Sequence, residues 1–128
     1  MPIQKVLMVD DEPDIRKIGL VSLRSVGKWA TVSASSGEEA LTLAAQEKPD
    51  LILLDVMMPG MTGPDVLVKL RQQPETASIP VIFMTAKVQR TEIDGYLALG
   101  AAGVISKPFD PMLLPQQIRA IVEKPNGD

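Results

Sequence analysis

The chain has neither cysteine nor histidine, and aromatic residues make up only 3% of its 128 residues. Without cysteine there can be no disulfide bond and no thiol chemistry, which fits a reducing compartment. The net charge is −3 and no run of basic residues occurs. A protein with no basic patch and few stacking side chains is a poor ligand for DNA or RNA, so we expect no direct nucleic-acid binding.

Long hydrophobic runs are missing as well. No segment approaches the ~18 consecutive apolar residues of a membrane-spanning helix. The first five residues lead straight into a strand pattern, with no signal peptide. Hydrophobic residues nevertheless make up 45% of the chain, enough for one compact core at this length. We therefore expect a cytoplasmic protein with one domain over residues 1–124 and a short C-terminal tail over residues 125–128.

Short apolar runs alternate with segments of helical period along the whole chain. This alternation is typical of a parallel β-sheet whose strands are connected by crossover helices. It predicts an α/β fold of the doubly wound (βα)5 type with a five-stranded parallel sheet. The expected strands are Lys5–Val9, Ala30–Ala34, Leu51–Leu54, Val81–Met84 and Gly103–Ser106.

The helix boundaries are marked by glycine, proline and capping residues. The first helix is expected over residues 13–26 and ends at Gly27, and a capping box of Ser36 and Glu39 begins the second. A third helix starts near Pro64 and a fourth covers residues 88–99. The last helix either starts near Pro115 or is kinked there, because proline cannot donate a backbone hydrogen bond.

Chemically active side chains follow four of the five expected strands. Asp55 ends the apolar run of residues 51–54, Asp10 and Asp11 follow the first strand, Thr85 follows the fourth, and Lys107 follows the fifth. Ligand sites of doubly wound sheets form at the carboxyl ends of the strands. We therefore expect these five side chains to gather at one edge of the sheet.

Three carboxylates in one pocket require a compensating charge. Two carboxylates at ~4 Å repel by ~4 kcal/mol at an effective dielectric constant of ~20. Oxygen ligands without histidine or cysteine favour Mg²⁺. With Lys107 and the Thr85 hydroxyl nearby, the site can bind a phosphoryl group. Asp55 would attack phosphorus, while Mg²⁺, Lys107, Thr85 and the backbone amide of Ala86 hold the oxygens.

Four motifs in this order resemble the receiver domain of two-component response regulators. They are Val9-Asp10-Asp11-Glu12, the run from Leu54 and Asp55 through Met57-Met58-Pro59-Gly60 to Gly63, Met84-Thr85-Ala86, and Lys107-Pro108-Phe109. The resemblance extends from about Lys5 to Val122. It implies a flavodoxin-like sheet with strand order 2-1-3-4-5 and a cis peptide bond between Lys107 and Pro108.

The resemblance also implies a function. Asp55 would be phosphorylated by a histidine kinase or a histidine phosphotransfer protein. Asp11 and Asp55 would bind Mg²⁺ directly, Asp10 would bind through water, and the Met57 carbonyl would complete the protein ligands. Such a protein is no enzyme beyond its own phosphorylation and dephosphorylation. It signals to a downstream protein or a linked output domain, in some cases as a dimer that depends on phosphorylation.

One position departs from what the resemblance leads one to expect. Receiver domains generally carry an aromatic residue three positions before the lysine, where this chain has Val104. Valine has no ring to bury, so we expect signalling through backbone shifts near residues 85–88 and through the fourth helix. Met57 and Lys87 flank the expected path of the hydrolytic water. Neither is a carboxylate or a carboxamide, which predicts slow self-dephosphorylation.

Other classes of protein share parts of this pattern. An adaptor that keeps the fold without phosphorylation is compatible with Val104 but makes no use of the acidic pocket. A flavodoxin would need a phosphate-binding loop where Asp10 and Asp11 stand. A phosphatase of the haloacid dehalogenase type would need a second carboxylate two residues after Asp55, at Met57. The acidic residues alone could also cap a helix N-terminus.

Overall fold

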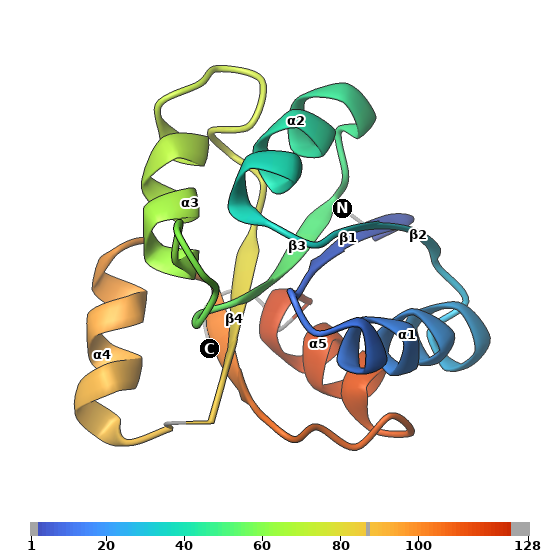
Figure 1. Cartoon of the computed structure of the whole chain (residues 1–128). Helices are drawn as coiled ribbons and strands as arrows, with labels where there is room; N and C mark the ends of the chain where they lie inside the picture. Colours follow the sequence, from blue (N-terminus) through green and yellow to red (C-terminus); the bar gives the residue numbers. More distant parts are fainter. Residues whose placement is uncertain (1–2, 87, 124–128) are drawn as a thin grey trace.

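The computed structural model describes residues 3–86 and 88–123. It contains a parallel sheet with strand order β2-β1-β3-β4-β5 (Figure 1). The strands are β1 Lys5–Val9, β2 Ala30–Ala34, β3 Leu51–Asp55, β4 Val81–Thr85 and β5 Gly103–Ser106. The predicted fold class and strand order are confirmed. Position 87 and the tail expected at 125–128 lie outside the described residues.

Both faces of the sheet are covered, so β3 is buried along its entire length. Ile52 and Leu54 point into a core closed by α2 (Gly37–Glu47) and α3 (Gly63–Arg71), against which Tyr96 of α4 also packs. Leu51 and Leu53 point into the opposite core, which is closed by α1 (Pro13–Val21) and α5 (Leu114–Val122). Continuous apolar runs are expected for strands buried on both faces.

The first helix has the predicted extent but not a uniform geometry. After α1, residues Ser22–Val26 form a π-helical turn, η1. Gly27 follows with a right-handed φ of −77°, and the left-handed residue is Lys28 at φ 64°. Gly27 is nevertheless required for packing, because a Cβ there would lie 2.7 Å from the Leu23 carbonyl oxygen.

The predicted capping box of α2 is only half present. The Ser36 hydroxyl accepts from the Glu39 amide, but the Glu39 carboxylate accepts from the Ser35 amide and hydroxyl instead of from Ser36. A complete capping box forms at α3, where Thr62 and Asp65 exchange both bonds. Aspartate can replace glutamate there because the carboxylate on its shorter side chain still accepts from the Thr62 amide, at 3.1 Å.

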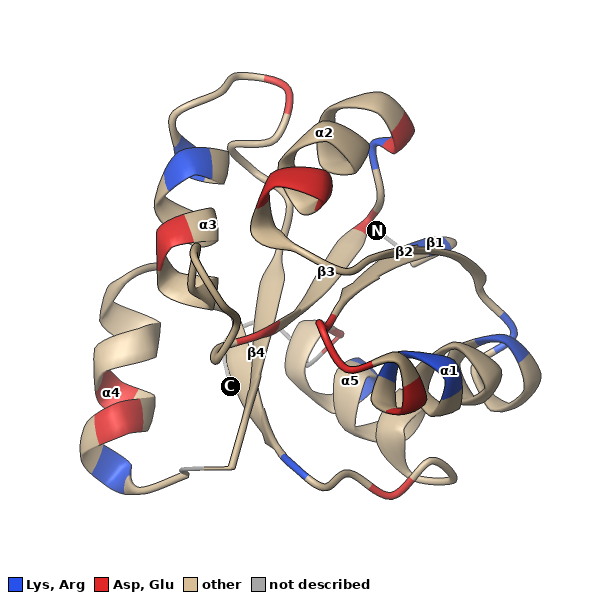
Figure 2. Ribbon diagram, viewed as in Figure 1, with Lys and Arg blue, Asp and Glu red and all other residues tan. Residues whose placement is uncertain are grey.

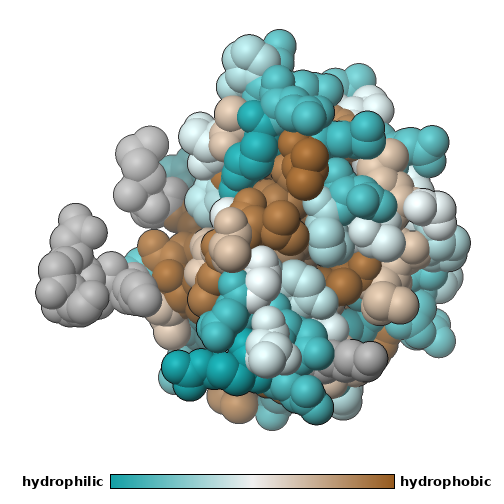
Figure 3. All heavy atoms as spheres, turned by 90° about the vertical axis from the view of Figure 1, so that its left-hand side faces the viewer, coloured by the Kyte–Doolittle hydropathy of each residue, from teal (hydrophilic) through white to brown (hydrophobic). Residues whose placement is uncertain are grey.

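The last two helices resolve what the sequence left open. Helix α4 spans Arg90–Ala98, two residues shorter at its start than expected, and none of its residues is buried. Helix α5 starts at Leu114 with Pro115 in its first turn, so it begins at the proline and has no kink. Apolar atoms gather on the face of α3 and α4 (Figure 3), where Val68, Leu97 and Leu99 are exposed. Over the described residues, every helix is too short or too polar to span a membrane.

Candidate functional site

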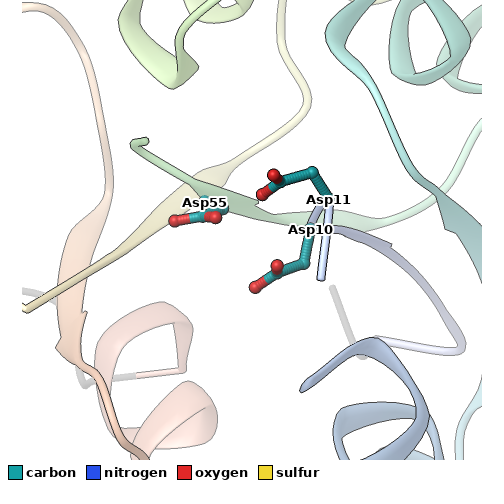
Figure 4. A group of neighbouring side chains, drawn as sticks. All are labelled: Asp10, Asp11 and Asp55. Carbon is teal, nitrogen blue, oxygen red and sulfur yellow. The ribbon is translucent and has the colours of Figure 1, made fainter. Parts of the chain in front are cut away.

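Three aspartates meet where β1 and β3 end. Asp55 is the last residue of β3 and is 3% exposed, and Asp10 follows β1 and is fully buried. Asp11 comes next and is half-buried. One carboxylate oxygen from each lies within 4.8 Å of the others, and the side chains converge on one small volume (Figure 4). The ends of β1 and β3 are the acidic edge of the sheet in Figure 2.

Lys107, the first residue after β5, supplies the positive charge of the site. Its Nζ lies 3.1 Å from Oδ2 of Asp10 and 3.4 Å from Oδ2 of Asp55. A third carboxylate, from Glu12, lies 3.4 Å from the same nitrogen and is largely exposed. The ammonium group therefore bridges the two buried aspartates and joins the end of β5 to the end of β1.

Burial and mutual repulsion change the acidity of these groups. Burial, followed by the negative charge of Asp10, raises the pKa of Asp55 from 3.8 to about 6, although Lys107 and the Met57 amide oppose this. For Lys107, burial lowers the pKa, but the hydrogen bond and charge of Asp10, together with Asp55, outweigh it and raise the pKa overall. One lysine thus does not fully compensate the acidic pocket.

The remaining predicted residues lie at the end of β4 and in the loop after β3. Thr85 ends β4 and is 4% exposed, and its carbonyl oxygen accepts from the Lys107 amide at 2.9 Å. Ala86 follows in an exposed bend. The Met57 amide donates to Oδ1 of Asp55 at 3.3 Å, while the Met57 side chain is 74% exposed. The Lys107–Pro108 peptide bond is cis, as predicted.

Comparison with known proteins assigns the chain to a family. A family model described as the response regulator receiver domain matches residues 6–119. This chain belongs to the response regulator receiver domain family. Receiver domains pair with histidine kinases, and the family typically consists of phosphoacceptor signalling domains rather than true enzymes.

Relatives and solved structures agree with this assignment. The probable transcriptional regulator ycf27 of Guillardia theta is 42% identical over 123 residues, which are 96% of this chain and 47% of the relative. The alkaline phosphatase synthesis regulator PhoP of Bacillus subtilis is 40% identical over 121 residues, which are 94% of this chain and 49% of PhoP. This receiver domain thus spans about half the length of these curated relatives.

A solved structure that covers the receiver domain almost completely is that of the chemotaxis protein CheY4 of Vibrio cholerae. It superposes with a TM-score of 0.86 at 31% identity, over 94% of this chain and all of CheY4. A response regulator of Desulfuromonas acetoxidans gives a TM-score of 0.83 at 26% identity, over 94% of this chain and 97% of that one.

The receiver's acidic pocket has the chemistry of a magnesium site. Among residues 3–86 and 88–123, the Asp11 carboxylate has no hydrogen-bond or ion-pair partner. Burial, followed by the charge of Asp10, raises the pKa of Asp55, and a bound cation would offset both effects. Carboxylate oxygens from three residues, open to solvent on the Asp11 side, suit a hard divalent cation that keeps several of its waters. The residues present therefore fit Mg²⁺.

Two contacts of the receiver site were not predicted from the sequence. The ion pair between Glu12 and Lys107 joins residues far apart in the chain, and only the parallel pairing of the strands brings them together. The second contact is from Arg16, whose guanidinium donates to the Asp10 carbonyl oxygen at 2.7 Å. The spacing of Asp10 and Arg16, across a strand end and the first turn of α1, offers a weak signal that could have been read.

Proposed function

We propose that this receiver accepts a phosphoryl group on Asp55 from a histidine kinase or a histidine phosphotransfer protein, in a reaction that depends on Mg²⁺. The phosphorylated domain signals through its altered surface and then loses the group by hydrolysis. The observation that carries the proposal is the juxtaposition of a buried Asp55 with Lys107, 3.4 Å away, inside a cluster of three aspartates.

The site offers each group that the transfer needs. An oxygen of Asp55 attacks phosphorus, the P–N bond of the phosphohistidine donor breaks, and the electron pair returns to the imidazole. Lys107 neutralises charge on the transferred group, and the Thr85 hydroxyl with the Ala86 amide can donate to its oxygens. Asp10, Asp11, Asp55 and the Met57 carbonyl would hold Mg²⁺, which supplies further positive charge when bound.

The acidity of Asp55 suits a nucleophile that works at neutral pH. With a pKa near 6, the carboxylate is mostly ionised at pH 7. It is also more basic than an exposed aspartate, whose pKa is about 3.9. A desolvated and more basic carboxylate is a better nucleophile, and Lys107 together with a bound cation would offset its charge.

Next to the site, α1 and the loop before α5 carry an apolar surface that supports docking of the phosphodonor. Ile18 and Val21 lie one turn apart on α1 and are 45% and 56% exposed. Met112 and Leu113 are 68% and 47% exposed. The Ser22 hydroxyl donates to the Pro111 carbonyl oxygen and joins the two segments. Exposed apolar clusters of this kind mark interaction sites.

Output would use a second surface, on α4, β5 and α5. A groove of about 410 Å³ opens there, lined by Val88, Ile93, Val104, Ile105, Ser106, Gln117, Ala120 and Ile121. We propose that a downstream protein, a linked output domain or a second copy of the phosphorylated receiver binds this face. The related regulators that are about twice as long support the linked domain.

One observation favours a second candidate function, a binding adaptor that works without phosphorylation. Val104 places no aromatic ring between α4 and the sheet, so a surface change driven by ring rotation is absent. The adaptor would use the same groove. It would leave the acidic pocket without a role, which is why we rank it second.

Mass spectrometry of the intact protein distinguishes a phosphoryl-accepting receiver from an adaptor that works without phosphorylation. After incubation with acetyl phosphate and Mg²⁺, we expect one added phosphoryl group, removed by hydroxylamine and absent from Asp55→Asn. A folded wild-type protein that gains no mass would contradict the proposed function and favour the adaptor. An adduct that persists in Asp55→Asn would show that another residue accepts the group.

A further inference from the structure

Asp10 is held by hydrogen bonds at every polar atom. Its amide donates to the Ala34 carbonyl oxygen at 3.1 Å, and its carboxylate accepts from the Glu12 amide at 2.9 Å and from Lys107 Nζ at 3.1 Å. The fourth bond comes from Arg16, whose Nη1 lies 2.7 Å from the Asp10 carbonyl oxygen. Three of the four partners come from backbone or from the site itself, and only Arg16 is a side chain from outside the pocket.

The carbonyl that Arg16 holds belongs to the peptide bond between Asp10 and Asp11. Fixing that peptide plane limits the rotation that would swing the Asp11 side chain away from Asp55. Asp11 has little else to hold it. It lies in a bend between β1 and α1, and its carboxylate has no partner among the described residues.

We propose that Arg16 is a positioning residue that holds the Asp10–Asp11 peptide so that the Asp11 carboxylate faces Asp55 before Mg²⁺ binds. This inference rests on the proposed function, because it concerns the same cation site. Pre-organised ligands lose less conformational entropy on binding. Arg16 lies near the start of α1 and is half-buried, whereas Ile18 and Val21, two and five residues further along the helix, are exposed.

Electrostatics and positioning predict opposite effects of removing Arg16. A guanidinium beside an acidic pocket repels an incoming cation, so loss of its charge alone would tighten Mg²⁺ binding. Loss of the anchor would weaken binding, because Asp11 then samples more orientations. Residues that orient metal ligands typically account for about 10- to 100-fold in metal affinity. The sign of the change therefore identifies the role of Arg16.

The test is calorimetric titration of the complete chain with Mg²⁺, comparing wild type with Arg16→Gln, Arg16→Lys and Lys17→Gln. Lys17 is exposed and forms no ion pair in the described structure, so Lys17→Gln removes the same charge without touching Asp10. We expect Arg16→Gln to weaken binding about tenfold. Arg16→Lys keeps the positive charge and a hydrogen-bond donor, so its Mg²⁺ affinity should lie between those of Arg16→Gln and wild type. The Mg²⁺ affinity of Lys17→Gln should stay within about twofold of wild type.

A second readout separates positioning from a general loss of structure. Phosphorylation by acetyl phosphate should need more Mg²⁺ for half-maximal rate in Arg16→Gln but reach the wild-type rate at saturation. A lower saturating rate, or affinity equal to or tighter than wild type, would overturn the inference and leave the proposed function intact. Failure of the wild-type protein to bind Mg²⁺ would instead overturn the proposed function, and the inference with it.

Discussion

Tyr96 of α4 packs edge-on against Phe83 of β4, with ring centroids 5.0 Å apart and an interplanar angle of 67°. Phe83 is fully buried and pairs in register with Val104 on β5. It lies two residues before Thr85, on the same side of the strand. An aromatic contact between α4 and β4 thus lies beside the valine that replaces the expected aromatic residue. The ring that links the helix to the sheet comes from α4 instead.

The first prediction concerns the anchoring of α4. No residue of this helix is buried, and Tyr96 is its aromatic contact to the core. Replacing Tyr96 by leucine removes the edge-to-face contact, worth ~0.5–1.5 kcal/mol beyond area burial. We expect Tyr96→Leu to lower the free energy of unfolding in urea by about 1–2 kcal/mol. The neighbouring Leu97 is 45% exposed, so Leu97→Ala should change the free energy of unfolding by less than about 0.5 kcal/mol.

The second prediction concerns the response of α4 to phosphorylation. The chain has one tyrosine, so ring-labelled ¹³C-tyrosine gives a single reporter on α4. If Thr85 moves toward the phosphoryl group, β4 and Phe83 shift with it, and the ring environment of Tyr96 changes. We expect the Tyr96 resonance and the amides of residues 88–98 to shift on adding beryllofluoride. Unchanged spectra in a protein that binds beryllofluoride would show that α4 is not the responding element.

The third prediction follows from the acidity of Asp55. Its pKa is about 6 in the folded protein and 3.8 when unperturbed, so the folded state binds this proton more tightly. The stability that Asp55 contributes is complete below about pH 4 and is lost as the pH rises to about 6. In EDTA at pH 7, Asp55→Asn should therefore be more stable than wild type, by on the order of 2 kcal/mol.

Thermal melts across pH 4 to 8 measure this difference. The advantage of Asp55→Asn should vanish near pH 4, where wild-type Asp55 is protonated. Added Mg²⁺ should raise the melting temperature of wild type much more than that of the variant, because the cation binds the folded acidic pocket. A variant that is less stable than wild type throughout would show that the ion pair of Asp55 with Lys107 outweighs desolvation.

The fold was predictable because the three central strands, β1, β3 and β4, each contain a continuous apolar run. What the sequence could not decide depends on contacts between distant segments. Asp55 and Thr85 belong to their strands because they pair in register with Met84 and Ser106 on the neighbouring strands. The sequence does not predict the π-helical turn of Ser22–Val26 either. After this turn, the Trp29 amide donates to the Leu23 carbonyl oxygen.

The sequence predicts which residues form the site but not which of them contact one another. A chemically active residue at the end of each central strand is visible in the sequence, since parallel strands end at one edge. The partners of those residues are not, because Lys107 could contact any of several carboxylates. The structure shows it between Asp10, Glu12 and Asp55. The anchor from Arg16 requires the first turn of α1 to fold back over Asp10.

The fourth prediction concerns the lifetime of the phosphorylated state. The Met57 side chain is 74% exposed beside Asp55 and cannot orient a water molecule by hydrogen bonding. Asparagine there can donate to or accept from the hydrolytic water, so Met57→Asn should speed phosphoryl loss. A tenfold increase corresponds to ~1.4 kcal/mol, about the net contribution of one hydrogen bond. Met112→Asn is the control, because Met112 is also exposed, at 68%, but lies in the loop before α5 and not directly after Asp55. Equal decay in all three proteins would contradict the prediction.

The last prediction compares two helix glycines. A Cβ on Gly63 would lie 2.6 Å from the Asp55 carbonyl oxygen and 2.9 Å from Cα of Val56, both backbone atoms that cannot move without shifting β3. A Cβ on Gly95 in α4 would meet nothing within 4 Å. Gly95→Ala should therefore stabilise the protein by about 0.5–1 kcal/mol through helix propensity.

Gly63→Ala should instead destabilise by more than about 1 kcal/mol and also slow phosphorylation of Asp55, because it displaces the loop that holds the nucleophile. Urea unfolding and the acetyl phosphate rate, measured on both variants, give the comparison. The same alanine then stabilises one helix and disrupts the other, because only Gly63 packs against the backbone of Asp55. A Gly63→Ala protein with wild-type stability and rate would mean that the end of β3 can relax without moving the nucleophile.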